Sequence, residues 1–203
     1  MRPAIRSTFD ILHWMTARAA SSGRKLDKAF ILKMLYLCQA FYGAVHDRRK
    51  LMPATFLATG AGPIEPDVYL ALENNFVLSE AVAPSAEVEK FLSSVWGMFQ
   101  DRSADELDMV LSKDTALAAA KARGRNSEIR LEEMAKTYKN GFPSSFAEDS
   151  AFASTRKEFE TGRSNLEAAP NSAQEVRFTA DGRSVTKWTP SRRVVTRRPS
   201  VVN

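Results

Sequence analysis

The segment Gly60-Ala61-Gly62-Pro63 has the glycine content that a phosphate-binding loop would need. Nucleotide-binding loops, however, carry either spaced glycines that end in Lys-Ser/Thr or a Gly-x-Gly-x-x-Gly sequence after a strand, and neither pattern is present. Proline also lacks the amide hydrogen that would help to bind an anion. We therefore interpret this segment as a structural turn.

Other residue types capable of catalysis or metal binding are isolated in the sequence. His13 and His46 are the two histidines, and no cysteine or acidic residue completes a ligand set with either at metal-binding spacing. Cys38 lies among apolar residues without a neighbouring base to activate it, so it is expected in the core. Acidic pairs such as Asp105-Glu106 fit helix caps. The sequence thus predicts no metal site, no cofactor and no enzymatic activity.

The length and composition favour one domain. A chain of 203 residues with 44% hydrophobic content has room for a sizeable core. The single cysteine rules out an internal disulfide and fits a reducing compartment. The amino-terminal sequence meets charged residues too early for a signal peptide, and no apolar run approaches membrane-spanning length. We expect a cytoplasmic protein without a membrane partner.

Helices must position these residues, because three-and-four spacing of apolar residues runs along most of the chain. The segment from Phe30 to Val45, capped by Asp27, is apolar on more than one face, which is typical of a core helix. The predicted fold is mainly α, an irregular bundle of six or seven helices around one central core helix, with a short extended segment near 51–57 and a C-terminal β-hairpin. Other helices are expected after Ser7, near Pro66, over Ala86 to Phe99, after Ser103, after Asp114 and over Glu128 to Tyr138.

The core helix and the turn after it form a recognisable pattern. It consists of the helix sequence KMLYLCQAFY over 33–42, then Leu51, Phe56, Ala58, Gly62-Pro63-Ile64, Pro66 and Val68-Tyr69. This pattern resembles one known family, the Panacea domain of SocA-like antitoxins. The resemblance spans about 9–138 and is most specific over 33–42 and 62–69. The family usually carries a Trp and a Tyr just before the Gly-Pro, and this chain has Thr59 and Ala61 there.

This resemblance implies a function in protein binding. Panacea-domain proteins look like antitoxins that neutralise a cognate protein toxin by binding it. The SocA branch resembles a proteolytic adaptor that hands its toxin to the ClpXP protease. The hypothesis is therefore a non-enzymatic, antitoxin-like interaction module, and the family-motif turn residues are Gly62, Pro63, Pro66 and Tyr69.

The chain continues beyond the region of resemblance. A capping box at Ser145 starts a helix with three apolar aromatics, Phe146, Phe152 and Phe159, which either lies on the domain or forms a partner surface. The helical domain is expected over 1–162 and a linker over 163–175. Residues 176–188, with a central Asp-Gly, predict a β-hairpin, and 189–203 a basic, disordered tail.

The excess positive charge lies in the tail. The formal net charge is +5, and residues 171–203 hold seven basic and two acidic residues, so the rest of the chain is balanced. Four interpretations stay open: a nucleic-acid-binding or phage-related accessory function, an acidic protein partner, a type IV secretion signal and a solubilising tail. The candidate binding residues here are Trp188, Arg192, Arg193, Arg197 and Arg198.

Overall fold

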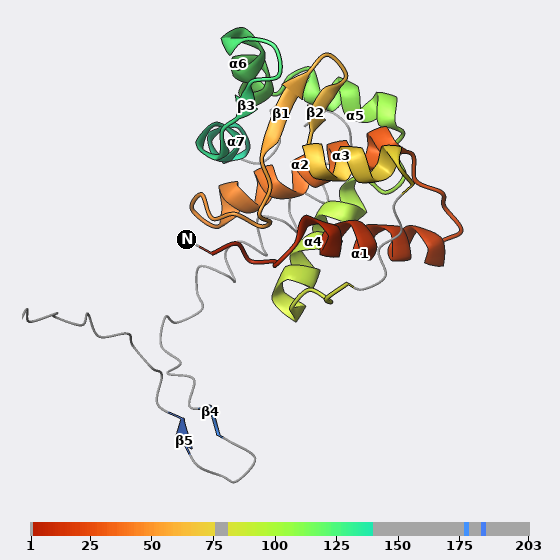
Figure 1. Ribbon diagram of the computed structural model, residues 1–203, viewed down its shortest axis with the longest axis vertical. Coiled ribbons are helices and arrows are strands. Elements are labelled where there is room, and N and C mark those ends of the chain that lie inside the picture. Colours follow the sequence, from red (N-terminus) through yellow and green to blue (C-terminus); the bar gives the residue numbers. More distant parts are fainter. Residues whose placement is uncertain (1, 76–80, 140–176, 179–183, 186–203) are drawn as a thin grey trace, which may run out of the picture. The chain divides into compact units, whose positions relative to one another are not determined.

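The computed structural model describes residues 2–75, 81–139, 177–178 and 184–185. The chain divides into two compact units, Met1–Leu166 and Glu167–Asn203. The described part of the first unit is mainly helical, as predicted, with seven helices and a three-stranded antiparallel sheet (Figure 1). The elements are α1 (Thr8–Ser21), α2 (Lys28–Val45), β1 (Phe56–Thr59), β2 (Gly62–Ile64), α3 (Pro66–Glu73), α4 (Ala86–Phe99), α5 (Ala104–Leu111), α6 (Thr115–Arg123), β3 (Glu128–Ile129) and α7 (Leu131–Tyr138).

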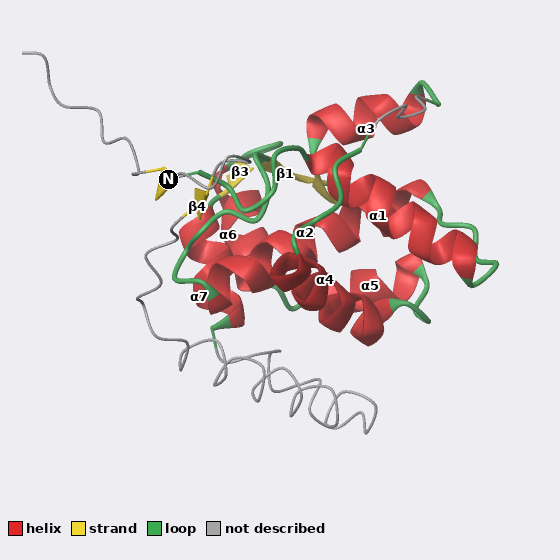
Figure 2. Ribbon diagram, turned by 90° about the horizontal axis from the view of Figure 1, so that it is seen from below, coloured by secondary structure: helices red, strands yellow, loops and turns green. Residues whose placement is uncertain are grey.

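Helix α2 is the centre of this unit, which confirms the predicted core helix. Its first turn is capped by Asp27, whose Oδ1 accepts a hydrogen bond of 2.6 Å from the Phe30 amide. Every residue from Phe30 to Gly43 is buried. A helix that is apolar on all sides needs neighbours on all sides, and α1, α3, α4, α5, α7 and β2 all pack against α2 (Figures 1 and 2).

The predicted helix starts are confirmed because their capping signals are local. Ser7 caps α1 through the Phe9 amide, and Ser85 caps α4. Ser103 and Glu106 form a reciprocal capping box at the start of α5. Helix α6 ends at Gly124, whose φ of +136° is a conformation that favours glycine. Local hydrogen bonding therefore sets the ends of the elements that surround α2.

The sheet differs in two places from the sequence prediction. The extended segment expected near 51–57 becomes a strand only at Phe56, and the last helix begins at Leu131 rather than at Glu128. Strand β1 is the central strand, between β2 and β3, so the backbone groups along both of its edges need hydrogen-bonding partners. Glu128 and Ile129 provide the partners along one edge, where Phe56 pairs with Ile129 in antiparallel register.

The second unit is described at two short strands only. Strand β4 (Arg177–Phe178) pairs in antiparallel fashion with β5 (Ser184–Val185), and Phe178 stands opposite Ser184. The Asp-Gly turn that the sequence predicts between them lies outside the described residues. The same holds for the predicted helix with Phe146, Phe152 and Phe159, for the linker over 163–175 and for the tail over 189–203.

Candidate functional site

The Gly62-Pro63 motif forms part of a β-hairpin that leads into α3. Thr59 stands opposite Gly62, so Gly60 and Ala61 form the tip of the hairpin. The Thr59 hydroxyl donates a hydrogen bond of 2.8 Å to the Gly62 carbonyl. Gly62 and Pro63 are buried, which agrees with their interpretation as a structural turn. These two motif residues therefore position the next helix and are not themselves a contact surface.

A buried lysine lies beneath the hairpin. Lys33 of α2, whose side chain is 5% exposed, donates to Asp108 Oδ2 at 2.6 Å and to the Ala104 carbonyl at 3.0 Å. A Cβ atom at Gly62 would lie 3.7 Å from Lys33 Cε and 3.8 Å from Asp108 Oδ1. The hairpin therefore packs over an ion pair that links α2 to α5.

We expect Gly62→Ala to lower the free energy of unfolding by about 1 to 3 kcal/mol. Gly62 has a φ of +109°, which an alanine adopts only with strain, whereas the neighbouring atoms leave ordinary contact distance for a methyl group. Urea denaturation measures the change. Gly60→Ala is the matched control, because nothing lies within 4 Å of a Cβ at this position. Equal losses in the two variants would contradict the argument from φ.

Helix α3 is fixed at its start by a buried carboxylate. Glu65 accepts a hydrogen bond of 2.7 Å from the Val68 amide, and Pro66 occupies the first turn, where its missing amide hydrogen costs nothing. Val68 is fully buried. At the other end of α3, Lys28 forms an ion pair of 3.2 Å with Glu73. The helix is short but held at both ends.

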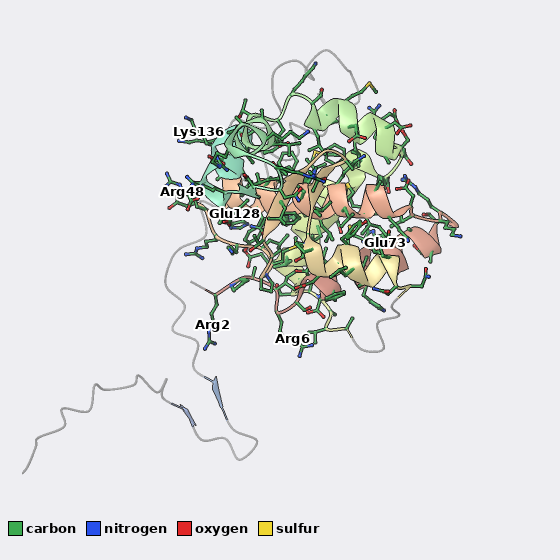
Figure 3. The ribbon with its side chains drawn as sticks, turned by 45° about the horizontal axis from the view of Figure 1, so that its top comes forward. Arg2, Arg6, Arg48, Glu73, Glu128 and Lys136 are labelled. Atoms are coloured by element: carbon green, nitrogen blue, oxygen red, sulfur yellow. The ribbon has the colours of Figure 1, made fainter. Side chains whose placement is uncertain are left out.

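The outward side of α3 carries two large hydrophobic residues. Tyr69 is 41% exposed and Leu70 is 57% exposed, although they are the two residues after the fully buried Val68. Successive helical residues point about 100° apart, so three consecutive apolar residues cannot all face the core. We call Tyr69 and Leu70 the α3 face. Glu73, at the end of the same helix, is labelled in Figure 3.

The titration of Glu65 gives a testable pH dependence. Burial raises the pKa of Glu65 above its ordinary value, although the hydrogen bond from Val68 opposes the shift. A raised pKa means that the carboxyl group contributes stability below about pH 4.3, the ordinary value, and that this contribution is lost as the pH rises through the shifted pKa. Glu65→Gln should therefore unfold with similar free energy at low pH and be more stable than the parent at pH 7. Thermal unfolding at both pH values tests this, and a variant that is less stable at pH 7 would contradict it.

The edges of the sheet are poorly suited to strand addition in the part of the chain that the structure describes. The Ala58 amide donates to Ser127, so Pro63, opposite Ala58, directs its backbone away from β1, where it has no amide hydrogen to offer. On the other edge, the Glu128 carbonyl accepts a hydrogen bond of 2.7 Å from Arg123 Nη2. A partner must therefore contact side chains.

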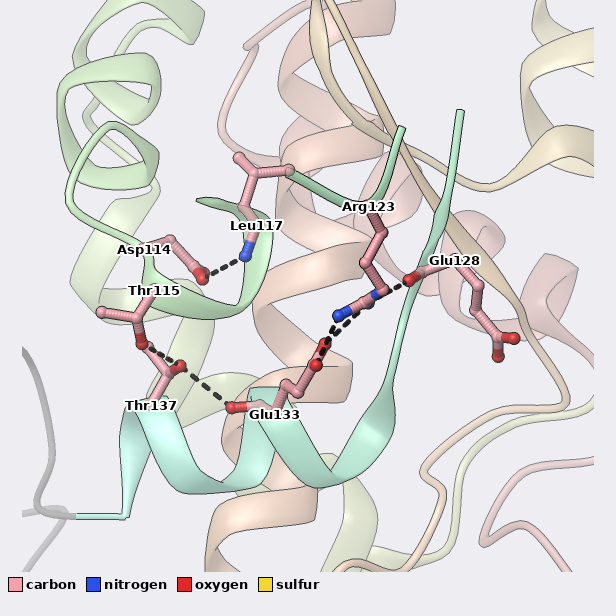
Figure 4. A network of polar contacts seen from close by, with 7 residues as sticks. All are labelled: Asp114, Thr115, Leu117, Arg123, Glu128, Glu133 and Thr137. Atoms are coloured by element: carbon pink, nitrogen blue, oxygen red, sulfur yellow. Dashed lines mark hydrogen bonds and ion pairs between the residues drawn. The ribbon is translucent and has the colours of Figure 1, made fainter. Parts of the chain in front are cut away.

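Helices α6 and α7 are joined by polar contacts at the surface (Figure 4). The Arg123 guanidinium donates to both carboxylate oxygens of Glu133, at 2.5 and 2.8 Å. This hydrogen bonding lowers the pKa of Glu133. The hydroxyl groups of Thr115 and Thr137 lie 2.7 Å apart. These contacts hold α7 in the position from which it packs along α2.

A buried polar cluster lies behind this surface. Asp114 is 1% exposed, and its Oδ2 atom accepts hydrogen bonds of 2.7 Å from the hydroxyl groups of both Tyr36 and Tyr138. Its Oδ1 atom accepts the Leu117 amide at 2.9 Å and so caps α6. Burial, reinforced by Asp114, raises the pKa of both tyrosines well above the ordinary value. The cluster joins α2, α6 and α7.

An open depression lies where the α1–α2 connection meets the start of α5. Arg24 Nη2 donates to the Arg102 carbonyl at 2.5 Å, and the Arg24 guanidinium lies 4.4 Å from the centre of the Phe30 ring. Arg102 in turn pairs with Glu106 at 3.2 Å. These contacts hold the two segments together. The depression is lined by Arg24, Gln100, Asp101, Arg102, Ser103 and Glu106.

The residues considered for chemistry are separated in the fold. Cys38 is buried on α2, and burial raises the pKa of its thiol to about 12, so little thiolate forms at neutral pH. His46 stacks on Tyr42 at the end of α2. Within the described residues, no three His, Cys, Asp or Glu side chains are grouped as metal ligands, and no helix has the length and apolar character to cross a membrane.

Comparison with family models, with curated proteins and with solved structures finds no match to this chain. Of the motif residues that the sequence singles out, the structure buries Gly62 and Pro63, half-buries Pro66 and exposes Tyr69. Leu70 joins Tyr69 on the surface and was not among the predicted site residues. Its signal in the sequence is the run of five consecutive apolar residues from Val68 to Leu72. The C-terminal candidates, from Phe146 to Arg198, lie outside the described residues.

Proposed function

We propose that this chain is a non-enzymatic, antitoxin-like module that binds a cognate protein toxin through the α3 face. The observation that carries the proposal is the exposure of Tyr69 and Leu70, at 41% and 57%, on a helix whose ends are fixed. Exposed tyrosine and leucine on adjacent positions suit a partner with an apolar pocket, because buried aromatic anchors dominate protein interfaces. The Panacea resemblance over 62–69 points to the same segment.

The rigidity of α3 favours binding. Ordering a flexible segment on association costs free energy, and a helix that is already capped by Glu65 and anchored by Val68 avoids most of that cost. In the relatives that this chain resembles, a Trp and a Tyr precede the Gly-Pro. Here the hairpin carries the smaller Thr59 and Ala61, so the large side chains available for binding are those of the α3 face.

The proposed outcome of binding is neutralisation of the toxin, with delivery to the ClpXP protease as its most specific form. This finer step rests on the resemblance to the SocA branch. One measurement distinguishes delivery to the protease from inhibition by binding alone, namely the half-life of the toxin in cells with and without ClpXP. Equal half-lives would remove the adaptor step and leave the binding proposal intact.

Co-expression tests the proposal. The full chain is produced together with the product of the gene next to its own, and growth and co-purification are measured. We expect growth to be restored and the two proteins to purify as one complex. No rescue and no co-purification would contradict the proposal.

The charge of the tail favours a second candidate, nucleic-acid binding or a phage-related accessory role through Arg192, Arg193, Arg197 and Arg198. Replacing these four residues with glutamine in the full chain tests it. The candidate is supported if the unmodified chain binds DNA or RNA and this variant does not. Binding whose affinity is independent of salt, or equal in the two proteins, would contradict it.

A further inference from the structure

Two segments that are distant in sequence meet at the C-terminal end of α2. The Ala4 amide donates to the Lys50 carbonyl at 3.0 Å, and the Ile5 amide donates to the Leu51 carbonyl at 2.8 Å. Ile5 and Leu51 are buried in the core, at 6% and 0% exposure, and anchor the two segments. The residues that flank these anchors therefore share one part of the surface.

The two segments, 2–6 and 47–50, carry five exposed cations and one carboxylate, that of Asp47. A second carboxylate, that of Glu87 on α4, lies close enough to Tyr42 and His46 to affect their pKa values, as Arg49 does. We call the five cations the basic face. None of them forms an ion pair with another residue that the structure describes. In Figure 3, Arg48 lies at the left of the unit, on the same side as Glu128 and Lys136, Arg2 and Arg6 lie at the bottom, and Glu73 lies at the right. The members are Arg2, Arg6, Arg48, Arg49 and Lys50.

The turn that presents three of these cations is well defined. Asp47 and Arg48 both have positive φ, at 46° and 61°. The Arg48 amide donates to the Gly43 carbonyl at 2.7 Å, and the Arg49 amide donates to the His46 carbonyl at 3.0 Å. The dipole of α2 stabilises cations near its C-terminal end. It does not account for Arg2 and Arg6, which come from the other segment.

We propose that the basic face binds the phosphodiester backbone of a nucleic acid. Four of its five cations are arginines, whose planar guanidinium groups match phosphate oxygens in two-point hydrogen bonds. An acidic protein fits less well, because protein interfaces need apolar anchors. The large exposed hydrophobic residues of the described chain are Tyr69, Leu70, Val82 and Met109, and none belongs to either segment. The basic face shares no residue with the α3 face or with the four tail arginines.

A salt titration of the full-length chain tests the proposal. The probes are a short duplex DNA and a single-stranded RNA of the same length, both labelled. We expect the unmodified chain to bind at least one of them, and the Arg48→Asn/Arg49→Gln variant to bind about tenfold more weakly, with the slope of log affinity against log salt reduced by about 2. Asparagine is chosen at position 48 because it tolerates positive φ.

Two further variants make the test specific. Arg18→Gln/Lys25→Gln removes the same charge from exposed positions near the opposite end of α2 and should change affinity less than about twofold. When the Arg48 and Arg49 substitutions are made in a chain whose four tail arginines are already replaced, they should weaken binding by the same factor as in the unmodified chain. Three results would each overturn the proposal. The unmodified chain could bind neither probe, the two double variants could lose affinity equally, or binding could depend on the tail arginines alone.

Discussion

Replacing Asp114 with alanine is expected to lower the free energy of unfolding by about 3 to 5 kcal/mol. The substitution removes the acceptor of the Tyr36 and Tyr138 hydroxyl groups, both of which are buried. Each buried hydroxyl group that loses this acceptor costs about 1 to 3 kcal/mol, and the lost cap of α6 costs about 1 kcal/mol more. Urea denaturation monitored by circular dichroism measures the change.

The tyrosine variants separate this network from general packing. Tyr36→Phe and Tyr138→Phe each keep the ring and remove one hydroxyl group, so each should cost only about 1 kcal/mol. Because the pKa of both tyrosines is raised in the fold, their hydroxyl groups contribute full stability below about pH 10, and this is lost as the pH rises through the shifted values. Each variant should lose part of that alkaline dependence. A loss of less than about 1 kcal/mol in Asp114→Ala would contradict the role given to this cluster.

The second large effect concerns binding. Leu70→Asp places a charge at the centre of the α3 face and should weaken the complex with the toxin at least about hundredfold, since burying an unpaired carboxylate adds to the lost apolar contact. Tyr69→Ala should weaken it by a similar amount, because the substitution removes the proposed aromatic anchor. Titration calorimetry of the purified proteins measures both values.

Met109→Asp is the matched control for this prediction. Met109 is 63% exposed on α5, so it introduces the same charge at an exposed hydrophobic residue of a different helix. It should leave affinity unchanged within about twofold, and all three substitutions should leave the free energy of unfolding within about 0.5 kcal/mol of the parent, as surface changes do. An equal loss of affinity in Met109→Asp would mean that the α3 face is not the specific contact.

The parts of the fold that could be predicted from the sequence are those set by neighbouring residues. The caps at Asp27, Ser103 and Asp114 depend on side chains within one helical turn, and the structure has them. The central position of α2 follows from its composition, because a helix without a polar side cannot lie on the surface.

The parts that could not be predicted depend on contacts between distant segments. Glu128 and Ile129 follow a helical pattern, yet pairing with β1 takes them into a strand. The sequence indicates only that a helix follows Asp114 and that another ends at Tyr138. Their hydrogen bond needs the packing of α7 on α2, which no spacing in the sequence reveals. The basic face likewise depends on backbone contacts between 4–5 and 50–51.

In the candidate site, too, the features set by neighbouring residues could be predicted and those set by packing could not. The Gly-Pro turn was evident from its residue types, and the structure gives Gly62 the positive φ that requires glycine. The sequence singled out Tyr69 through the family motif, but which of Val68, Tyr69 and Leu70 faces solvent depends on how α3 packs.

Hydrogen exchange on the complex tests the central claim most directly. The full chain is mixed with the product of the adjacent gene, and the exchange of backbone amides is compared with that of the free chain. Val68 is the one buried residue of α3, so most of the helix faces away from the core and its amides can gain protection when a partner covers it. We predict that amides of α3 become slow in the complex while those of α5 around Met109 do not change. Protection confined to elements other than α3, or no protection anywhere, would contradict the account.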